Sequence, residues 1–217
     1  MIKFDNEEVQ MLIETKLKKT EFTIDDLKSI SYISIDGSEL NSILSSKDLR
    51  LLSNIRFVNY TDIDFRGISF ENMEGHTIKF DKCNIENIVC TNSKFTSVEI
   101  RNCNFDESIK ELLNVDGLEE ISITHNADID MDRIINDYPD FEKISFWDQI
   151  NIKSKSCYKI PKNLDLALLS NCTNLKTLNL SGIHVNDVNV LQNFEKLESL
   201  RYKQCMYVEW TEITKYA

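Results

Sequence analysis

The side chains with the most specific chemistry in this sequence are six cysteines and three histidines. A zinc site needs three or four such ligands, usually supplied in closely spaced pairs. Cys83, Cys90 and Cys103 lie within one stretch of the chain, but no Cys-x-x-Cys pair and no neighbouring histidine completes a zinc-binding set. Structural thiols are therefore favoured over metal ligands, and the sequence predicts neither a metal nor any other cofactor.

Catalytic constellations are not predicted either. His76, His125 and His184 occupy three different positions of the repeat described below, so they do not converge on a nucleophile. Adjacent carboxylates such as Glu119 and Glu120 point to opposite sides of a strand, which favours solvated surface over an acid–base pair. The glycine-rich sequences that cradle phosphate groups do not occur. We expect a protein that is not an enzyme.

Charge and hydropathy narrow the class of function. The formal net charge of −11 disfavours binding to nucleic acid or to an anionic membrane, because both reward an excess of lysine and arginine. The first residues carry charges throughout, and no apolar run approaches the roughly 18 residues of a membrane helix. A cytoplasmic protein with reduced cysteines is expected.

The elements that would position these side chains follow from an internal repeat. In the segment NLKTLNLSGIHV, which begins at Asn174, leucines stand at relative positions 1, 4 and 6. Similar triads recur 20 to 23 residues apart, except for one 34-residue gap. The eight triads are Ile30, Ile33, Ile35; Leu52, Ile55, Phe57; Gly75, Ile78, Phe80; Phe95, Val98, Ile100; Leu118, Ile121, Ile123; Phe141, Ile144, Phe146; Leu175, Leu178, Leu180; and Leu197, Leu200, Tyr202.

This pattern resembles the leucine-rich-repeat family over nearly the whole chain, and its period of about 22 residues is similar to that of the Sds22-like and internalin-like branch. The family has Asn or Cys at position 9, which here holds Cys83, Cys103, Asn126 and Cys205, whereas Ser38, Tyr60, Gln149 and Ile183 depart from it. The resemblance implies an α/β solenoid, a right-handed superhelix with a curved parallel sheet of about eight strands and an N-terminal helical cap.

The repeat predicts one domain with three parts. Residues 1–28 form the helical cap, in which Thr23 is the expected N-cap of the second helix. Residues 29–205 hold eight repeats with an insertion near 147–162, and residues 206–217 cap the C-terminal end. Between Asn59 and Phe105 large apolar residues also recur at multiples of five, as in pentapeptide repeats. The segment NLDLALLSN from Asn163 predicts a helix on the convex side.

Strand geometry predicts which side chains are free to meet a partner. Positions 4 and 6 share one side of each strand and form the core, whereas positions 3, 5 and 7 point to the concave face. That face is slightly basic in an otherwise acidic protein. The candidate partner-binding residues are Tyr32, Arg56, Lys79, Glu99, Arg101, Lys143, Trp147, Arg201 and Lys203.

Two features of the sequence keep alternative interpretations open. An outward Trp147 suits a binding hot spot, but it suits equally well a side chain packed beneath the loop that follows. The insertion at 147–162 either takes part in binding or is merely tolerated.

The function that the sequence favours is a non-catalytic scaffold that binds a protein partner on its concave face. Its amino-acid usage is typical of a bacterial gene, and an inhibitor, an immunity-type protein or an adaptor would fit. The alternative is a self-associating structural protein that forms a homodimer. Its C-terminal segment, with Tyr207, Trp210 and Tyr216, either caps the last repeat or pairs with another copy.

Overall fold

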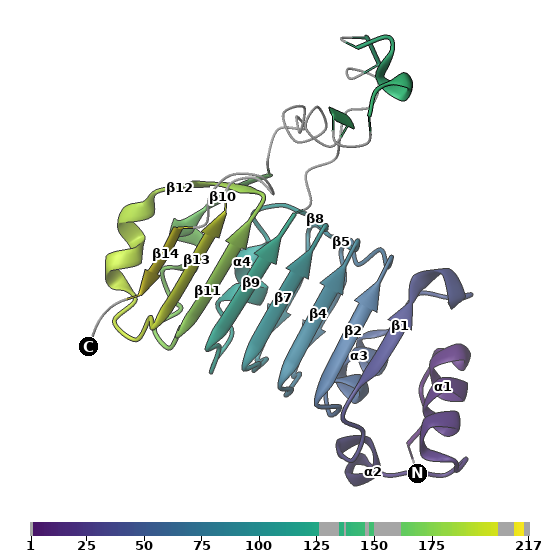
Figure 1. The fold of residues 1–217 in the computed structure, drawn as a ribbon. Helices are drawn as coiled ribbons and strands as arrows, with labels where there is room; N and C mark the ends of the chain where they lie inside the picture. Colours follow the sequence, from purple (N-terminus) through teal and green to yellow (C-terminus); the bar gives the residue numbers. More distant parts are fainter. Residues whose placement is uncertain are drawn as a thin grey trace.

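The computed structural model describes residues 2–125, 135–136, 138–145, 148–149, 162–203 and 211–214. Its main element is an eight-stranded sheet (Figure 1). In spatial order the strands are β1 (Ile33–Asp36), β2 (Phe57–Thr61), β4 (Thr77–Asp81), β7 (Ser97–Arg101), β9 (Glu120–Thr124), β11 (Thr177–Ser181), β13 (Ser199–Lys203) and β14 (Thr211–Thr214). Neighbours from β1 to β13 pair in parallel, and β14 pairs antiparallel with β13. The fold is an α/β repeat fold with a mostly parallel sheet.

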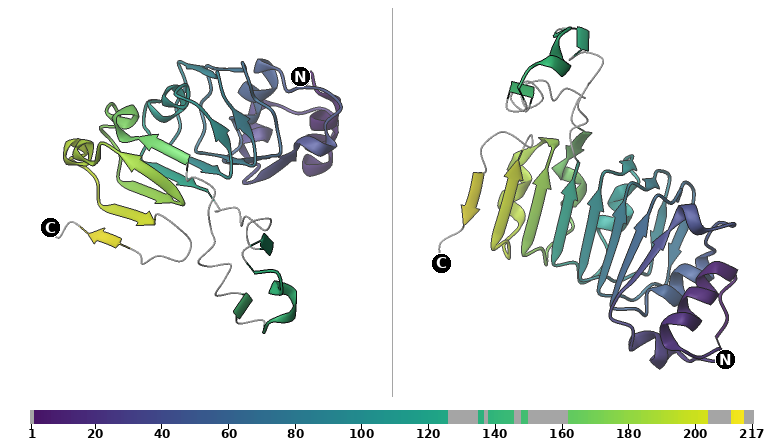
Figure 2. Two further views of the ribbon diagram at one scale, coloured as in Figure 1. Left: turned by 90° about the horizontal axis from the view of Figure 1, so that it is seen from above. Right: turned by 45° about the vertical axis from the view of Figure 1, so that its right-hand side comes forward.

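A second layer covers one side of this sheet and encloses the core (Figure 2). It contains the helices α3 (Ser46–Leu52), α4 (Ile109–Leu113), η3 (Leu166–Leu169) and η4 (Val188–Asn193). It also contains three parallel strand pairs, β3 (Ser69–Glu71) with β6 (Val89–Thr91), β5 (Asn84–Ile85) with β8 (Asn104–Phe105), and β10 (Lys162–Asp165) with β12 (Ile183–Asn186). No described helix covers the opposite side of the sheet (Figure 1).

The strands β2, β4 and β7 belong to coils of 20 residues. Phe57 pairs with Thr77 and Thr77 with Ser97, and the pairs of the second layer keep the same offset. Residues with positive φ follow one another at multiples of five, at Asp62, Gly67, Asn72, Lys82, Asn87, Asn92 and Asn102. All but Lys82 are Asn, Asp or Gly, which adopt this left-handed conformation at least cost and turn the chain at the corners of the coils. The five-residue period expected between Asn59 and Phe105 is confirmed.

An aromatic cluster fills these coils. Phe80 is fully buried, and its ring centroid lies 5.6 Å from that of Tyr60, 5.5 Å from that of Phe65 and 5.9 Å from that of Phe70. The last two contacts are edge-to-face, an arrangement that stabilises beyond simple burial. Tyr60 and Phe80 are paired on the neighbouring strands β2 and β4, whereas Phe65 and Phe70 come from other sides of the coil, so the cluster ties adjacent coils and both layers together.

The N-terminal end of the sheet is closed by α1 (Glu7–Leu17) and α2 (Ile24–Lys28), which lie in the segment predicted to be a helical cap. Thr23 is the N-cap of α2, as predicted, and forms a capping box with Asp26. The buried Asp48 carboxylate accepts hydrogen bonds from the backbone N–H groups of Asp5 at 2.7 Å and Asn6 at 3.2 Å. This carboxylate therefore attaches the start of α1 to α3.

Two of the eight predicted triads were wrong. One was placed in the wrong register, and the other does not form a strand of the sheet. In the second repeat Ile55, Val58 and Tyr60 occupy the buried positions, because Leu52 still belongs to α3. The sixth triad is not a strand of the sheet, because Phe141–Lys143 form the 3-10 helix η2 and β9 pairs directly with β11. The insertion is therefore longer than predicted, and the described sheet has seven parallel strands.

The remaining expectations about the repeats have mixed outcomes. Lys162–Asp165 is a strand followed by a 3-10 helix, so the predicted convex helix is wrong, although Leu164 and Leu169 are buried. At position 9 the buried thiols of Cys83 and Cys103 donate to backbone carbonyls, as expected for this turn. Asn126 and Cys205 lie outside the described residues.

Phe80→Ala tests whether the aromatic cluster stabilises the coils. Truncating a fully buried phenylalanine should lower the free energy of unfolding by about 3–5 kcal/mol, measured by urea denaturation. The control Val89→Ala, on the half-exposed outer side of β6, should change it by less than about 1 kcal/mol. Equal effects of the two variants would contradict a core centred on Phe80.

Candidate functional site

The helix-free side of the main sheet, here called the sheet face, carries rows of side chains. Because the strands pair in parallel register, equivalent outward positions stack about 4.8 Å apart. The central row is Ser34, Asn59, Lys79, Glu99, Ser122, Asn179 and Arg201. The next row is Asp36, Thr61, Asp81, Arg101, Thr124 and Ser181. Seven of these thirteen residues are small and polar, and four of the six charged ones lie on the neighbouring strands β4 and β7.

A shallow hollow of about 340 Å³ lies beside charged residues of β4 and β7. Its lining includes Lys79, Glu99, Arg101 and Asn179. The Lys79 ammonium is 3.8 Å from the Glu99 carboxylate, and both side chains are partly exposed. An exposed ion pair at this distance contributes little to stability. Because both side chains are partly exposed, both charges are accessible to a partner.

Three outward side chains have a buried oxygen atom without a hydrogen-bond partner among the described residues. These atoms are Asn59 Oδ1, Asp81 Oδ1 and Asn179 Oδ1. Asn59 Nδ2 donates to Ser34 Oγ at 2.9 Å, and Asn179 Nδ2 donates to Ser122 Oγ at 3.1 Å, so each amide uses only its donor end across the strands. A buried acceptor left unpaired costs about 1–3 kcal/mol. Because the three oxygens are buried, they are not open to a partner, and the groups that a partner can contact are the accessible charges of Glu99 and Arg101.

An aromatic pair borders the sheet face where β1 and β2 begin. Tyr32 is 45 % exposed, and its ring centroid lies 5.2 Å from that of Phe57, which is half-buried. Packing on Phe57 orders the tyrosine ring without hiding it. An ordered, exposed tyrosine is a side chain typical of binding hot spots.

The structure brings together only some of the predicted site residues. Lys79, Glu99 and Arg101 meet at the hollow, and Arg201 lies farther along the central row. The placement of Arg56 on the concave face is wrong, because it precedes β2 at the edge where the strands begin. Lys143 is also outside the sheet, in η2, with its ammonium 2.7 Å from the Asp140 carboxylate.

Two further predicted residues cannot be assigned a side-chain position. Trp147 lies outside the described residues, and of Lys203 only the backbone pairing in β13 is described. Sequence reasoning missed Phe57 and Asn59 as outward residues because the second repeat was placed three positions too early. The alternation of buried and half-buried residues along β2 is the signal that identifies them.

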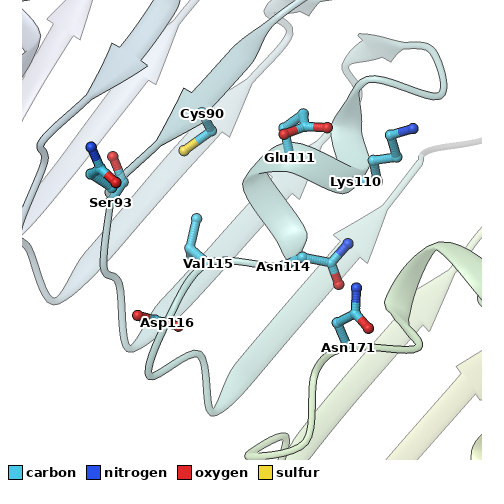
Figure 3. A pocket seen from close by; sticks show the side chains of 9 residues that line it. Cys90, Ser93, Lys110, Glu111, Asn114, Val115, Asp116 and Asn171 are labelled. Carbon is cyan, nitrogen blue, oxygen red and sulfur yellow. The ribbon is translucent and has the colours of Figure 1, made fainter.

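A separate hollow of about 520 Å³ lies beside α4 in the second layer (Figure 3). Cys90 and Ser93 line one side, and Glu111 and Asn114 of α4 line the other. Burial raises the pKa of the Cys90 thiol from 9.0 to about 11. A thiol that stays protonated is a poor nucleophile or metal ligand. Within the described ranges, no three His, Cys, Asp or Glu side chains are grouped to hold a metal ion.

Comparison with known proteins adds little to this geometry. No family model matches the chain, and no curated protein matches it. One similar solved structure is an internalin from Listeria monocytogenes, with 13 % sequence identity and a TM-score of 0.27. The match covers 91 % of this chain and 62 % of the internalin, so the chain spans less than two thirds of that protein. A likeness this weak carries no argument. None of the described helices could cross a membrane.

The buried thiols should be slow to alkylate in the folded protein. Burial raises the pKa of Cys90 to about 11 and that of Cys172 to about 12, so less thiolate is present at pH 8 than for a thiol with a pKa of 9.0. We expect iodoacetamide to modify Cys90 at least roughly 100-fold more slowly in native protein than in urea, measured by peptide mass spectrometry. Equal rates in the two states would contradict the described burial.

Proposed function

We propose that this protein is a non-catalytic scaffold that binds a protein partner on the sheet face. The observation that carries the proposal is the group of accessible charged side chains, Lys79, Glu99 and Arg101, at a shallow hollow on the side of the sheet that no described helix covers. A protein surface that carries charges of opposite sign would complement this group. We also propose that the coils form a right-handed solenoid of the leucine-rich-repeat type, in which the sheet face is the concave side.

The chemistry of the sheet face favours a protein over other classes of ligand. Small-molecule sites are deep and mostly apolar, whereas this hollow is shallow and polar. Nucleic acid requires an excess of cations, but Lys79, Arg101 and Arg201 are offset by acidic residues on the same face. These acidic residues are Asp36, Asp81, Glu99 and Glu120. A polar protein surface with both signs of charge is the complementary ligand.

Self-association is a second candidate function. β14 is the last strand of the described sheet, and edge strands can pair with another chain. A second copy paired along β14 would continue the sheet. Light scattering distinguishes the two proposals, because a monomer at all accessible concentrations excludes this one. The finer roles of inhibitor, immunity-type protein or adaptor, and a cytoplasmic location, remain predictions.

Arg101→Glu should weaken binding of the partner. The partner is first identified by photo-crosslinking from a benzoylphenylalanine placed at Ser122 in the hollow, and its affinity is then measured by calorimetry. Reversing the exposed Arg101 charge at the centre of the sheet face should raise the dissociation constant at least about tenfold, or about 1.4 kcal/mol, without changing the melting temperature.

The matched control reverses a charge in the second layer. Lys110→Glu, on the exposed side of α4, changes the net charge equally but should leave the affinity within about twofold. If the two variants weaken binding alike, or if crosslinks form from Val89 of β6 but not from Ser122, the partner does not bind the sheet face.

A further inference from the structure

A third hollow, of about 540 Å³, lies at the edge of the sheet where the strands begin. It is lined by Lys28, Ser53, Asn54, Arg56, Glu74, Gly75, His76, Lys94 and Thr96, none of which lines the hollow of the sheet face. Three of these side chains are cationic and one is a carboxylate, although the chain as a whole has a net charge of −11. The edge hollow is therefore a local exception to the acidic surface.

Stacking of the coils places these cations together. The Arg56 backbone N–H donates to the Ile30 carbonyl at 3.3 Å, and the Arg56 carbonyl accepts from the Thr77 N–H at 3.1 Å. The His76 carbonyl accepts in the same way from the Thr96 N–H at 2.9 Å. The bends that precede β2, β4 and β7 are thus stacked, and Lys28 joins them from the last turn of α2. Backbone hydrogen bonds hold the site, so it exists before a ligand arrives.

The cations of the edge hollow are not neutralised by ion pairs within the described part of the chain. Described ion pairs involve other lysines and arginines, and Asp26, which is close in sequence to Lys28, pairs with Lys19. Lys94 forms isolated parallel β-bridges with Glu74 on one side and Asp116 on the other, so these two acidic neighbours partly compensate its charge. Lys28 and Arg56 form no ion pair with another described residue, and Glu74 is the one acidic side chain that lines the hollow beside them.

We propose that the edge hollow binds an acidic segment of the protein partner, an inference that rests on the proposed function. Arg56 and Lys94 stand on coils two strands apart, which separates their backbones by about 10 Å. That distance suits carboxylates three residues apart in a peptide with polyproline II conformation, which has three residues per turn and a rise of about 3.1 Å per residue, so both carboxylates face the same side. A compact anion midway between them would face the Glu74 carboxylate, whereas a peptide can present an N–H group there. Opposite charge also accelerates association of an acidic partner.

The test uses a blocked hexaglutamate peptide and the full chain labelled with ¹⁵N. Titration at low salt should shift the backbone amide signals of Arg56, His76 and Lys94 saturably, and raising the ionic strength should weaken binding because the contacts are electrostatic. The double variant Lys28→Glu/Arg56→Glu should weaken binding at least about tenfold. A blocked hexaserine peptide should not bind.

The control variant Lys16→Glu/Lys110→Glu alters the net charge equally at exposed positions outside the edge hollow and should keep the affinity within about twofold. Equal weakening by both double variants, or shifts that avoid the hollow, would overturn the proposal. Inorganic phosphate that binds as tightly as the peptide would also overturn it, since a single oxyanion would then suffice. Peptide binding needs no partner, so its failure is separable from failure of the Arg101→Glu test.

Discussion

The structure depends on parallel pairing between successive coils of the chain. No coil can satisfy its own strand hydrogen bonds or bury its own apolar side, so each relies on its neighbours for both. From β2 to β7 this dependence is strict, because every side of a coil pairs with the next at an offset of 20 residues. The inward aromatic cluster and the outward rows of polar residues are two consequences of the same register.

The polar rows show how that register produces a surface with its own chemistry. An asparagine on one strand lies beside a hydroxyl group on the next, and the pair uses the amide donor while leaving the amide oxygen unpaired. Stability alone would favour a partner for that oxygen, or an apolar side chain in its place. The strand register therefore decides which donor meets which acceptor on the sheet face.

The sheet face and the edge hollow differ in charge although the same coils build both. Outward strand positions mix acids and bases, whereas the edge hollow contains Lys28 of α2 and Arg56 of the bend before β2, neither of which forms an ion pair with a described residue. A partner that contacts both would therefore need polar groups of both signs for the sheet face and an acidic segment for the edge. Such a division favours one orientation of the partner over its reverse.

The sequence by itself determined that the chain has a repeated, parallel-stranded architecture, because every coil must place apolar residues at the same inward positions. It also indicated the five-residue period between Asn59 and Phe105, since large apolar residues recur there at multiples of five. Only tertiary structure decided the rest. The triad from Phe141 has the right spacing, yet hydrogen bonds between β9 and β11 exclude it from the sheet. Leu52 and Phe57 are both apolar, but Leu52 is the last residue of a helix and Phe57 faces outward from a strand. The spacing of apolar residues cannot distinguish these roles from inward strand positions. The unpaired oxygens and the edge hollow depend on contacts between distant coils, which no local pattern records.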